Sequence, residues 1–111
     1  MKKTLILLVM ALAALPFAAD AKGFADYHTE TLKLPCTTCH KTPDTMPTTE
    51  TCTGCHPTDK LVESTKNVKP TNPHTSPHYG AKLDCVNCHV GHEPSENYCA
   101  QCHKFDFKMK H

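Results

Sequence analysis

The sequence has few large apolar side chains beyond its N-terminal stretch. From Lys22 to His111 only nineteen residues are Ala, Val, Leu, Met, Phe or Tyr, and eight of the nine prolines fall in the same span. A chain of this size with so few apolar groups cannot bury enough surface to offset its ordering entropy. An ordinary hydrophobic core is therefore excluded, and we expect the fold to depend on crosslinks, metals or bound groups.

Two further absences narrow the function. No apolar segment follows the one from Leu5 to Leu15, which is itself shorter than the roughly 20 residues that span a bilayer. The four glycines form no Gly-x-Gly-x-x-Gly sequence, so neither a dinucleotide site nor a flavin site is predicted. We therefore expect a chain that is not membrane-embedded and that leaves any substrate reduction to another polypeptide.

The N-terminus has the pattern of a secretory signal peptide. Lys2 and Lys3 precede the apolar stretch, and a run of small residues ends at Ala21. This pattern predicts cleavage after Ala21, with retention as an uncleaved anchor the alternative. We expect residues 1–21 to be a cleaved signal peptide and residues 22–111 to form one domain exported to a bacterial periplasm.

Cysteine occurs only in a motif that is repeated four times. Each copy reads Cys-x-x-Cys-His, the attachment signature of c-type haem. The two thiols add to the two vinyl groups of one porphyrin, and the histidine ligates the iron. The sequence therefore predicts four covalent haems. The predicted thioether cysteines are Cys36, Cys39, Cys52, Cys55, Cys85, Cys88, Cys99 and Cys102, and the motif histidines are His40, His56, His89 and His103.

The remaining histidines decide the chemistry at iron. They are His28, His74, His78, His92 and His111. Four of them could supply the second axial ligand of the four haem irons. Bis-histidine iron is suited to electron transfer because it has no free position for substrate. Met46 and Met109 are weaker candidates. We expect His28, His74, His78 and His92 to ligate, and we leave His111, at the chain terminus, as the rival of His28.

Local patterns predict little regular structure. Thr58 is a candidate N-cap for a short helix, and Ser95 is a candidate N-cap for another that continues to about Lys104. The prolines from Pro70 to Pro77 require irregular backbone, and strand signals are poor. We expect a small multihaem cytochrome, mostly irregular, with a few short α-helices packed around four covalent haems and almost no β-structure.

Charge excludes one class of partner. The chain from Lys22 onward has ten lysines, no arginine and ten acidic residues, so the polypeptide is neutral before cofactors are added. Haem propionates then make the holoprotein acidic. Nucleic acid is therefore not an expected partner.

The pattern resembles the small periplasmic tetrahaem cytochromes and the tetrahaem domain of flavocytochrome c fumarate reductases. The resemblance begins at Phe24-Ala25-Asp26-Tyr27-His28, runs through the four motifs and ends at Met109. It implies the axial pairs His40 with His28, His56 with His74, His89 with His78 and His103 with His92. The separation of His28 from His40 is a couple of residues longer than in those relatives.

Two functions fit these features, and in both the chain is an electron carrier and not an enzyme. The first is a relay of anaerobic respiration that takes electrons from a quinol-oxidising membrane cytochrome to soluble or outer-membrane acceptors. The second is a dedicated subunit that donates electrons to a separate flavoprotein reductase of fumarate or a similar unsaturated carboxylate.

Two chemical alternatives stay open. The cysteine pairs could hold structural zinc or form disulfides. The first haem could be catalytic if His28 did not ligate its iron.

Overall fold

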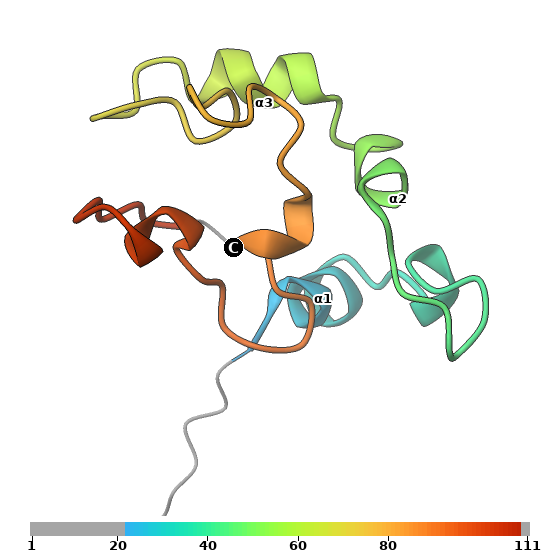
Figure 1. Cartoon of the computed structure of the whole chain (residues 1–111). Coiled ribbons are helices and arrows are strands. Elements are labelled where there is room, and N and C mark those ends of the chain that lie inside the picture. Colours follow the sequence, from blue (N-terminus) through green and yellow to red (C-terminus); the bar gives the residue numbers. More distant parts are fainter. Residues whose placement is uncertain (1–21, 110–111) are drawn as a thin grey trace, which may run out of the picture.

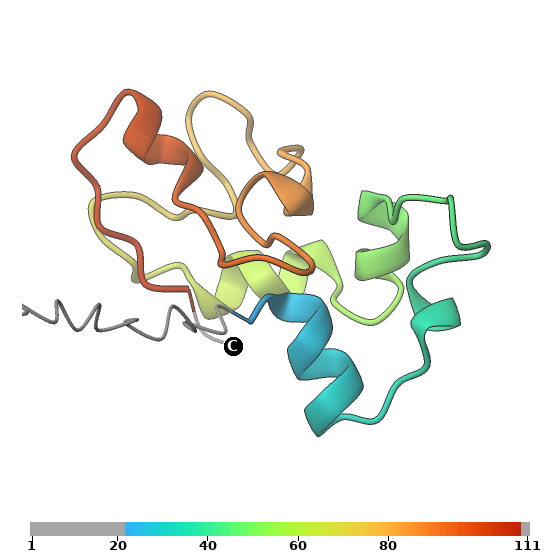
Figure 2. The same ribbon diagram turned by 90° about the horizontal axis from the view of Figure 1, so that it is seen from below.

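The computed structural model describes residues 22–109, which form short helical segments joined by irregular backbone (Figures 1 and 2). In chain order these are α1 (Phe24–Asp26), a π-helical turn η1 (Tyr27–Thr31), η2 (Cys36–Thr38), α2 (Thr49–Thr53), α3 (Thr58–Ser64), η3 (Cys85–Asn87) and η4 (Tyr98–Gln101). Within these residues there is no strand, and Ser76 and Gly80 form an isolated bridge. The predicted fold class, few short helices and almost no β-structure, is confirmed.

Each Cys-x-x-Cys-His motif folds into the same tight turn. In every copy the backbone N–H of the histidine donates to the carbonyl oxygen of the first cysteine. The four distances are 2.9 Å for His40, 2.9 Å for His56, 2.8 Å for His89 and 2.8 Å for His103. The segments η2, η3 and η4 are 3₁₀ turns of this kind, and α2 ends within the second motif. The repeated sequence therefore gives four similar local structures on an otherwise irregular chain.

The two predicted helices differ from the observed ones at their starts. The helix after the second motif is present as α3, but its N-cap is Pro57 and Thr58 is its first residue. The helix predicted from Ser95 to Lys104 is only the turn Tyr98–Gln101, capped by Asn97. The reason is that Glu96 donates its N–H to the Cys88 carbonyl at 2.9 Å, which holds the preceding residues out of a helix.

The N-terminal segment is attached to a distant part of the chain. The N–H groups of Phe24 and Ala25 donate to the carbonyls of Val90 and Gly91, at 3.1 and 2.6 Å. Gly23, at the start of this contact, is buried, and a Cβ at that position would lie 2.2 Å from the Gly91 carbonyl oxygen. Glycine is needed here because the two backbones approach too closely for a side chain. In both views α1 lies beside the loop that follows η3 (Figures 1 and 2).

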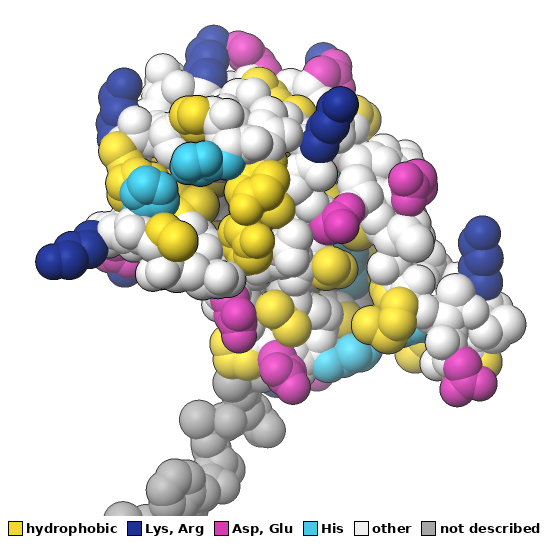
Figure 3. Space-filling view, in the orientation of Figure 1, with side chains coloured by type: hydrophobic (Ala, Val, Ile, Leu, Met, Phe, Trp, Pro, Cys, Tyr) yellow, Lys and Arg dark blue, Asp and Glu magenta, His cyan; other side chains and the backbone are white. Residues whose placement is uncertain are grey.

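The polypeptide has no hydrophobic core of its own. Among residues 22–109 no apolar side chain is buried. Figure 3 shows apolar and histidine side chains together at the surface, where a globular protein would cover them. In the same part of the chain no helix has the length and hydropathy needed to cross a membrane.

Candidate haem sites

The eight histidines of the described residues lie in four pairs, each joining a motif histidine to one from elsewhere. The ring centroids are 6.0 Å apart for His28 and His56, 6.2 Å for His40 and His92, 6.2 Å for His74 and His89, and 5.9 Å for His78 and His103. Two imidazoles on opposite faces of one metal ion, each with a metal–nitrogen bond of about 2.0 Å and a centroid about 1.1 Å further out, have centroids about 6.2 Å apart. All four spacings therefore fit one iron between two rings.

The partners within these pairs are not those that the family resemblance implied. The same eight histidines are used, but His40 faces His92 and His28 faces His56. The histidines of the central connection are each shifted to the next motif. His74 lies against His89, and His78 lies against His103.

The physical reason for the first two pairs is the attachment of α1 to residues 90 and 91. The bonds from Phe24 and Ala25 fix the helical segment that carries His28 against the loop that carries His92. His28 is thereby held near the second motif, and His92 is left to face the first. His111, the rival of His28, lies outside the described residues.

Hydrogen bonds at Nδ1 orient the ligand candidates. Nδ1 of His28 donates to the Phe24 carbonyl at 2.6 Å, and Nδ1 of His40 donates to the Thr45 carbonyl at 2.7 Å. Metal-binding histidines use such bonds to fix the tautomer, because a proton on Nδ1 leaves Nε2 free to ligate. No local sequence pattern marks the carbonyls of Phe24 and Thr45 as partners of these rings.

His74 is positioned from the end of α3. Its Nδ1 donates to the Thr65 hydroxyl at 3.0 Å, and its backbone N–H donates to the Asn72 side-chain oxygen at 3.0 Å. The Asn72 amide also donates to the Val62 carbonyl at 2.8 Å. Asn72 and Thr65 therefore tie the proline-rich connection to α3, which places His74 against the third motif.

His74 and His89 form a pair of half-buried rings. Burial lowers the pKa of His74. Burial, followed by the charges of His74 and His56, lowers the pKa of His89. Both shifts in pKa favour the neutral ring, which is the form that binds a metal. Phe24 covers His89 edge-on, with ring centroids 4.5 Å apart.

The cysteines show which motifs are neighbours. None of the eight forms a disulfide. Burial, and then the adjacent Cys85, raise the pKa of Cys52 to about 11, and Cys39 adds a smaller contribution. Burial also raises the pKa of Cys88, with a minor contribution from Cys99. The second motif thus lies next to the third, where Thr49 also donates to Asp84 at 2.7 Å, and Cys39 and Cys99 are near enough to influence Cys52 and Cys88.

The cysteine geometry also bears on the alternatives. Among residues 22–109 no three or more His, Cys, Asp or Glu side chains converge as they would around a single metal ion. The described thiols also form no disulfide. The alternative zinc and disulfide arrangements therefore have no counterpart in this part of the chain.

The sequence profile of the cytochrome c3 family matches residues 27–104. The chain belongs to the cytochrome c3 family. It is therefore an electron-transfer cytochrome that carries covalent haem c, and the predicted family resemblance is confirmed.

Two curated relatives are informative about this cytochrome. It is 36% identical over 112 residues to the acrylate reductase cytochrome subunit of Shewanella woodyi, and the match covers 96% of each chain. It is 33% identical over 76 residues to a probable fumarate reductase, Ifc3, of Shewanella frigidimarina. That match covers 66% of this chain and 13% of the relative, so the similarity is confined to a small part of the larger protein. No solved structure matches the chain.

Aromatic side chains flank the last site of the cytochrome. Phe105 stacks on His103, with ring centroids 4.5 Å apart and an interplanar angle of 7°. Phe107 then packs on Phe105 at 5.7 Å. On the opposite side Tyr79 contacts both His78 and Tyr98, at 6.1 and 5.9 Å. These aromatic rings surround the pair His78 and His103 with apolar side chains.

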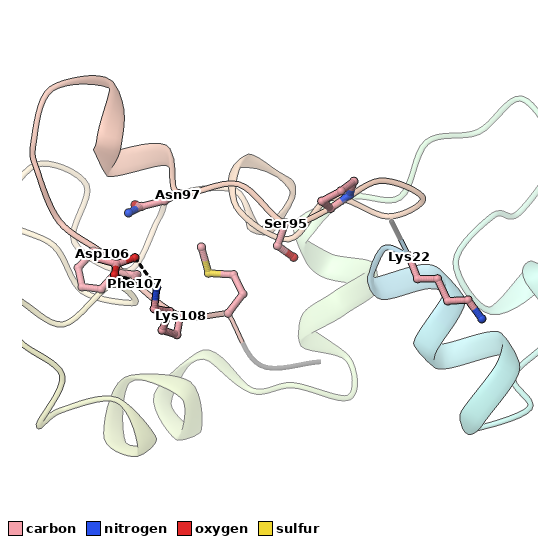
Figure 4. Close-up of a pocket in the computed structure, with 8 residues that line it drawn as sticks. Lys22, Ser95, Asn97, Asp106, Phe107 and Lys108 are labelled. Carbon is pink, nitrogen blue, oxygen red and sulfur yellow. Dashed lines mark hydrogen bonds and ion pairs between the residues drawn. The ribbon is translucent and has the colours of Figure 1, made fainter. Parts of the chain in front are cut away.

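A cavity of about 470 Å³ lies near the C-terminus of the cytochrome, away from the histidine pairs. Figure 4 shows Ser95 and Asn97 on one segment and Asp106, Phe107 and Lys108 on another, with Lys108 paired to Asp106. Ser95 Oγ and Asn97 Oδ1 are buried there without a hydrogen-bond partner. The lining contains no histidine or cysteine, so this cavity is not an iron site.

Proposed function

We propose that this cytochrome holds four haems c, each with two histidine ligands, and relays electrons through them. The four histidine pairs with centroid spacings of 5.9 to 6.2 Å are the observation that carries the proposal. Each haem would supply one-electron redox chemistry. With two histidines on every iron, the chain's own residues leave no position for substrate.

The residues are assigned motif by motif. The first haem would take Cys36, Cys39, His40 and His92; the second Cys52, Cys55, His56 and His28; the third Cys85, Cys88, His89 and His74; the fourth Cys99, Cys102, His103 and His78. The proximity of Cys52 to Cys85, and the electrostatic influence of Cys39 on Cys52 and of Cys99 on Cys88, support a relay in which each haem neighbours the next along the chain.

We also propose a cellular setting. Residues 1–21 would be removed as a signal peptide, and residues 22–111 would form one tetrahaem domain in the periplasm. A quinol-oxidising membrane cytochrome would be the donor in anaerobic respiration, and a soluble or outer-membrane redox protein would be the acceptor. Nucleic acid would not be a partner, because haem propionates make the holoprotein acidic.

The haem count tests this function. Produced in a bacterium that matures c-type cytochromes, the exported protein should have the mass of residues 22–111 plus four haems. A variant with both cysteines of one motif replaced by alanine, such as Cys99→Ala with Cys102→Ala, is the matched control and should carry three. A wild-type mass with fewer than four haems would overturn the proposal.

A second candidate function is that of a dedicated subunit. The full-length match to the cytochrome subunit of an acrylate reductase supports it. In this case the acceptor would be a separate flavoprotein that reduces an unsaturated carboxylate such as acrylate or fumarate. Pull-down with the holoprotein from cells grown anaerobically on such a carboxylate should recover a stable flavoprotein complex. Recovery of no flavoprotein would leave the freely diffusing relay as the function.

A further inference from the structure

The histidine ligands of this cytochrome differ in the group that faces Nδ1. His28 and His40 face backbone carbonyls, and His74 faces a hydroxyl. His92 instead faces a carboxylate, since Oδ1 of Asp26 lies 3.8 Å from its Nδ1. Within residues 22–109 this is the one histidine that has a carboxylate within 4 Å.

The carboxylate is held in place by its own hydrogen bonds and by the fold. Oδ2 of Asp26 accepts the backbone N–H of Gly23 at 2.8 Å. The same segment is fixed to the His92 loop by the backbone bonds from Phe24 and Ala25. The Asp26 side chain is 28% exposed and that of His92 is 69% exposed, so water shields the carboxylate charge only in part. Its position beside His92 therefore follows from the attachment of α1.

A carboxylate in this position favours the oxidised state of the iron. A negative charge near Nδ1 increases the electron donation of the ring to the metal and attracts the additional positive charge of ferric haem. A neutral carbonyl or hydroxyl does this more weakly. The haem that has His92 as a ligand should therefore be harder to reduce than it would be with a neutral partner.

We propose that Asp26 is a positioning residue that lowers the reduction potential of the haem attached at Cys36 and Cys39. The proposal rests on the assignment of His40 and His92 to that haem. Asp26 would thus help to set the order in which the four haems accept electrons, and it acts through His92 without contact with the iron.

The test is a redox titration of the tetrahaem holoprotein and of its Asp26→Asn variant, followed through the NMR signals of the individual haems. Asparagine keeps an acceptor for the Gly23 N–H but removes the charge. Because the pair is partly exposed, we expect about a threefold to tenfold gain in the reduction equilibrium constant of the first haem, up to 59 mV for one electron. The other three haems should keep their potentials.

Glu30→Gln is the matched control. Glu30 lies on the adjoining η1 turn and pairs with Lys22 at the surface, so its loss changes the net charge equally without touching His92. It should leave the first haem unchanged. If Asp26→Asn does not assemble, Asp26→Ser provides a second neutral variant with the same expected shift.

The outcomes separate the inference from the function on which it rests. A wild-type protein without four low-spin haems would contradict the proposed function. Four low-spin haems in an Asp26 variant, with an unmoved potential at the first haem or an equal shift in Glu30→Gln, would overturn the role of Asp26 alone. A purely structural role would lower the thermal midpoint of the holoprotein without moving that potential.

Discussion

At the scale of single residues, each candidate iron site consists of a motif histidine and a second histidine from another part of the chain, with ring centroids 5.9 to 6.2 Å apart. The motif spacing identifies Cys36 and Cys39 as an attachment pair because the chemistry of two vinyl groups requires it. Histidine offsets along the chain carry no such requirement. The number of residues between His56 and His74 does not determine whether their rings face each other. In the structure His74 faces His89, with ring centroids 6.2 Å apart.

The polar groups that orient these rings were also beyond the sequence pattern. Thr65 and Asn72 look like ordinary residues of a helix end and a proline-rich turn, yet together they position His74. Asp26 belongs to an acidic, aromatic opening segment, and only the fold brings its carboxylate to the loop of His92. Such residues serve a ligand that is distant in sequence, so no local signal marks them.

The pairing gives a prediction at this scale. Replacement of His28 by alanine should remove the sixth ligand of the second haem, at Cys52 and Cys55, and leave the first haem low-spin. The reason is that His28 faces His56, at 6.0 Å, and not His40. Ferric EPR should show one high-spin haem in His28→Ala, and paramagnetic NMR should assign it to the second motif.

His111→Ala is the control for that prediction, because His111 is the sequence rival of His28 as a ligand. All four haems of this variant should remain low-spin. If the high-spin haem of His28→Ala is instead the first, the pairing seen in the structure would be wrong and the one implied by the resemblance right.

At the scale of elements, local sequence determined the turns and the short helix, and long-range hydrogen bonds determined the rest. The four motif turns recur because each closes its own bond between histidine and the first cysteine. The segment α3 follows from a helical pattern between Pro57 and Thr65. In contrast, the helix predicted from Ser95 fails because Asn97 donates to the Phe105 carbonyl at 2.6 Å and Glu96 to Cys88.

The contact of α1 with residues 90 and 91 is the element-level feature with the largest effect on function. It fixes two of the four histidine pairs and the Asp26 carboxylate together. The contact requires glycine at position 23, because the Gly91 backbone lies too close to Gly23 for any side chain there. A lone glycine has many roles in proteins, so this requirement could not be recognised from sequence.

At the scale of the whole molecule, the polypeptide supplies candidate iron ligands and aromatic side chains beside them, but it has no hydrophobic core among residues 22–109. No apolar side chain of residues 22–109 is buried, as the composition predicted. The hydrophobic surface that stabilises most domains must then come from the flat faces of the haems. Phe24, Phe105 and Tyr79 each contact a ligand ring, which is the arrangement expected of side chains that pack around cofactors.

The closeness of consecutive motifs suits electron transfer from one haem to the next. Thr49 and Asp84 join the second and third motif segments, and cysteines of the first and fourth motifs lie within electrostatic range of these two. Two histidines at each iron would exclude substrate from every position along the path. Membership in the cytochrome c3 family agrees with electron transfer as the purpose of this arrangement.

The most direct measurement is ferric EPR of the fully loaded wild-type protein, with spins counted against the haem content. The account predicts four low-spin signals and no high-spin signal, because each of the four histidine pairs would close one iron. A high-spin signal equal to one haem or more would contradict it, since at least one iron would then have an open position for substrate.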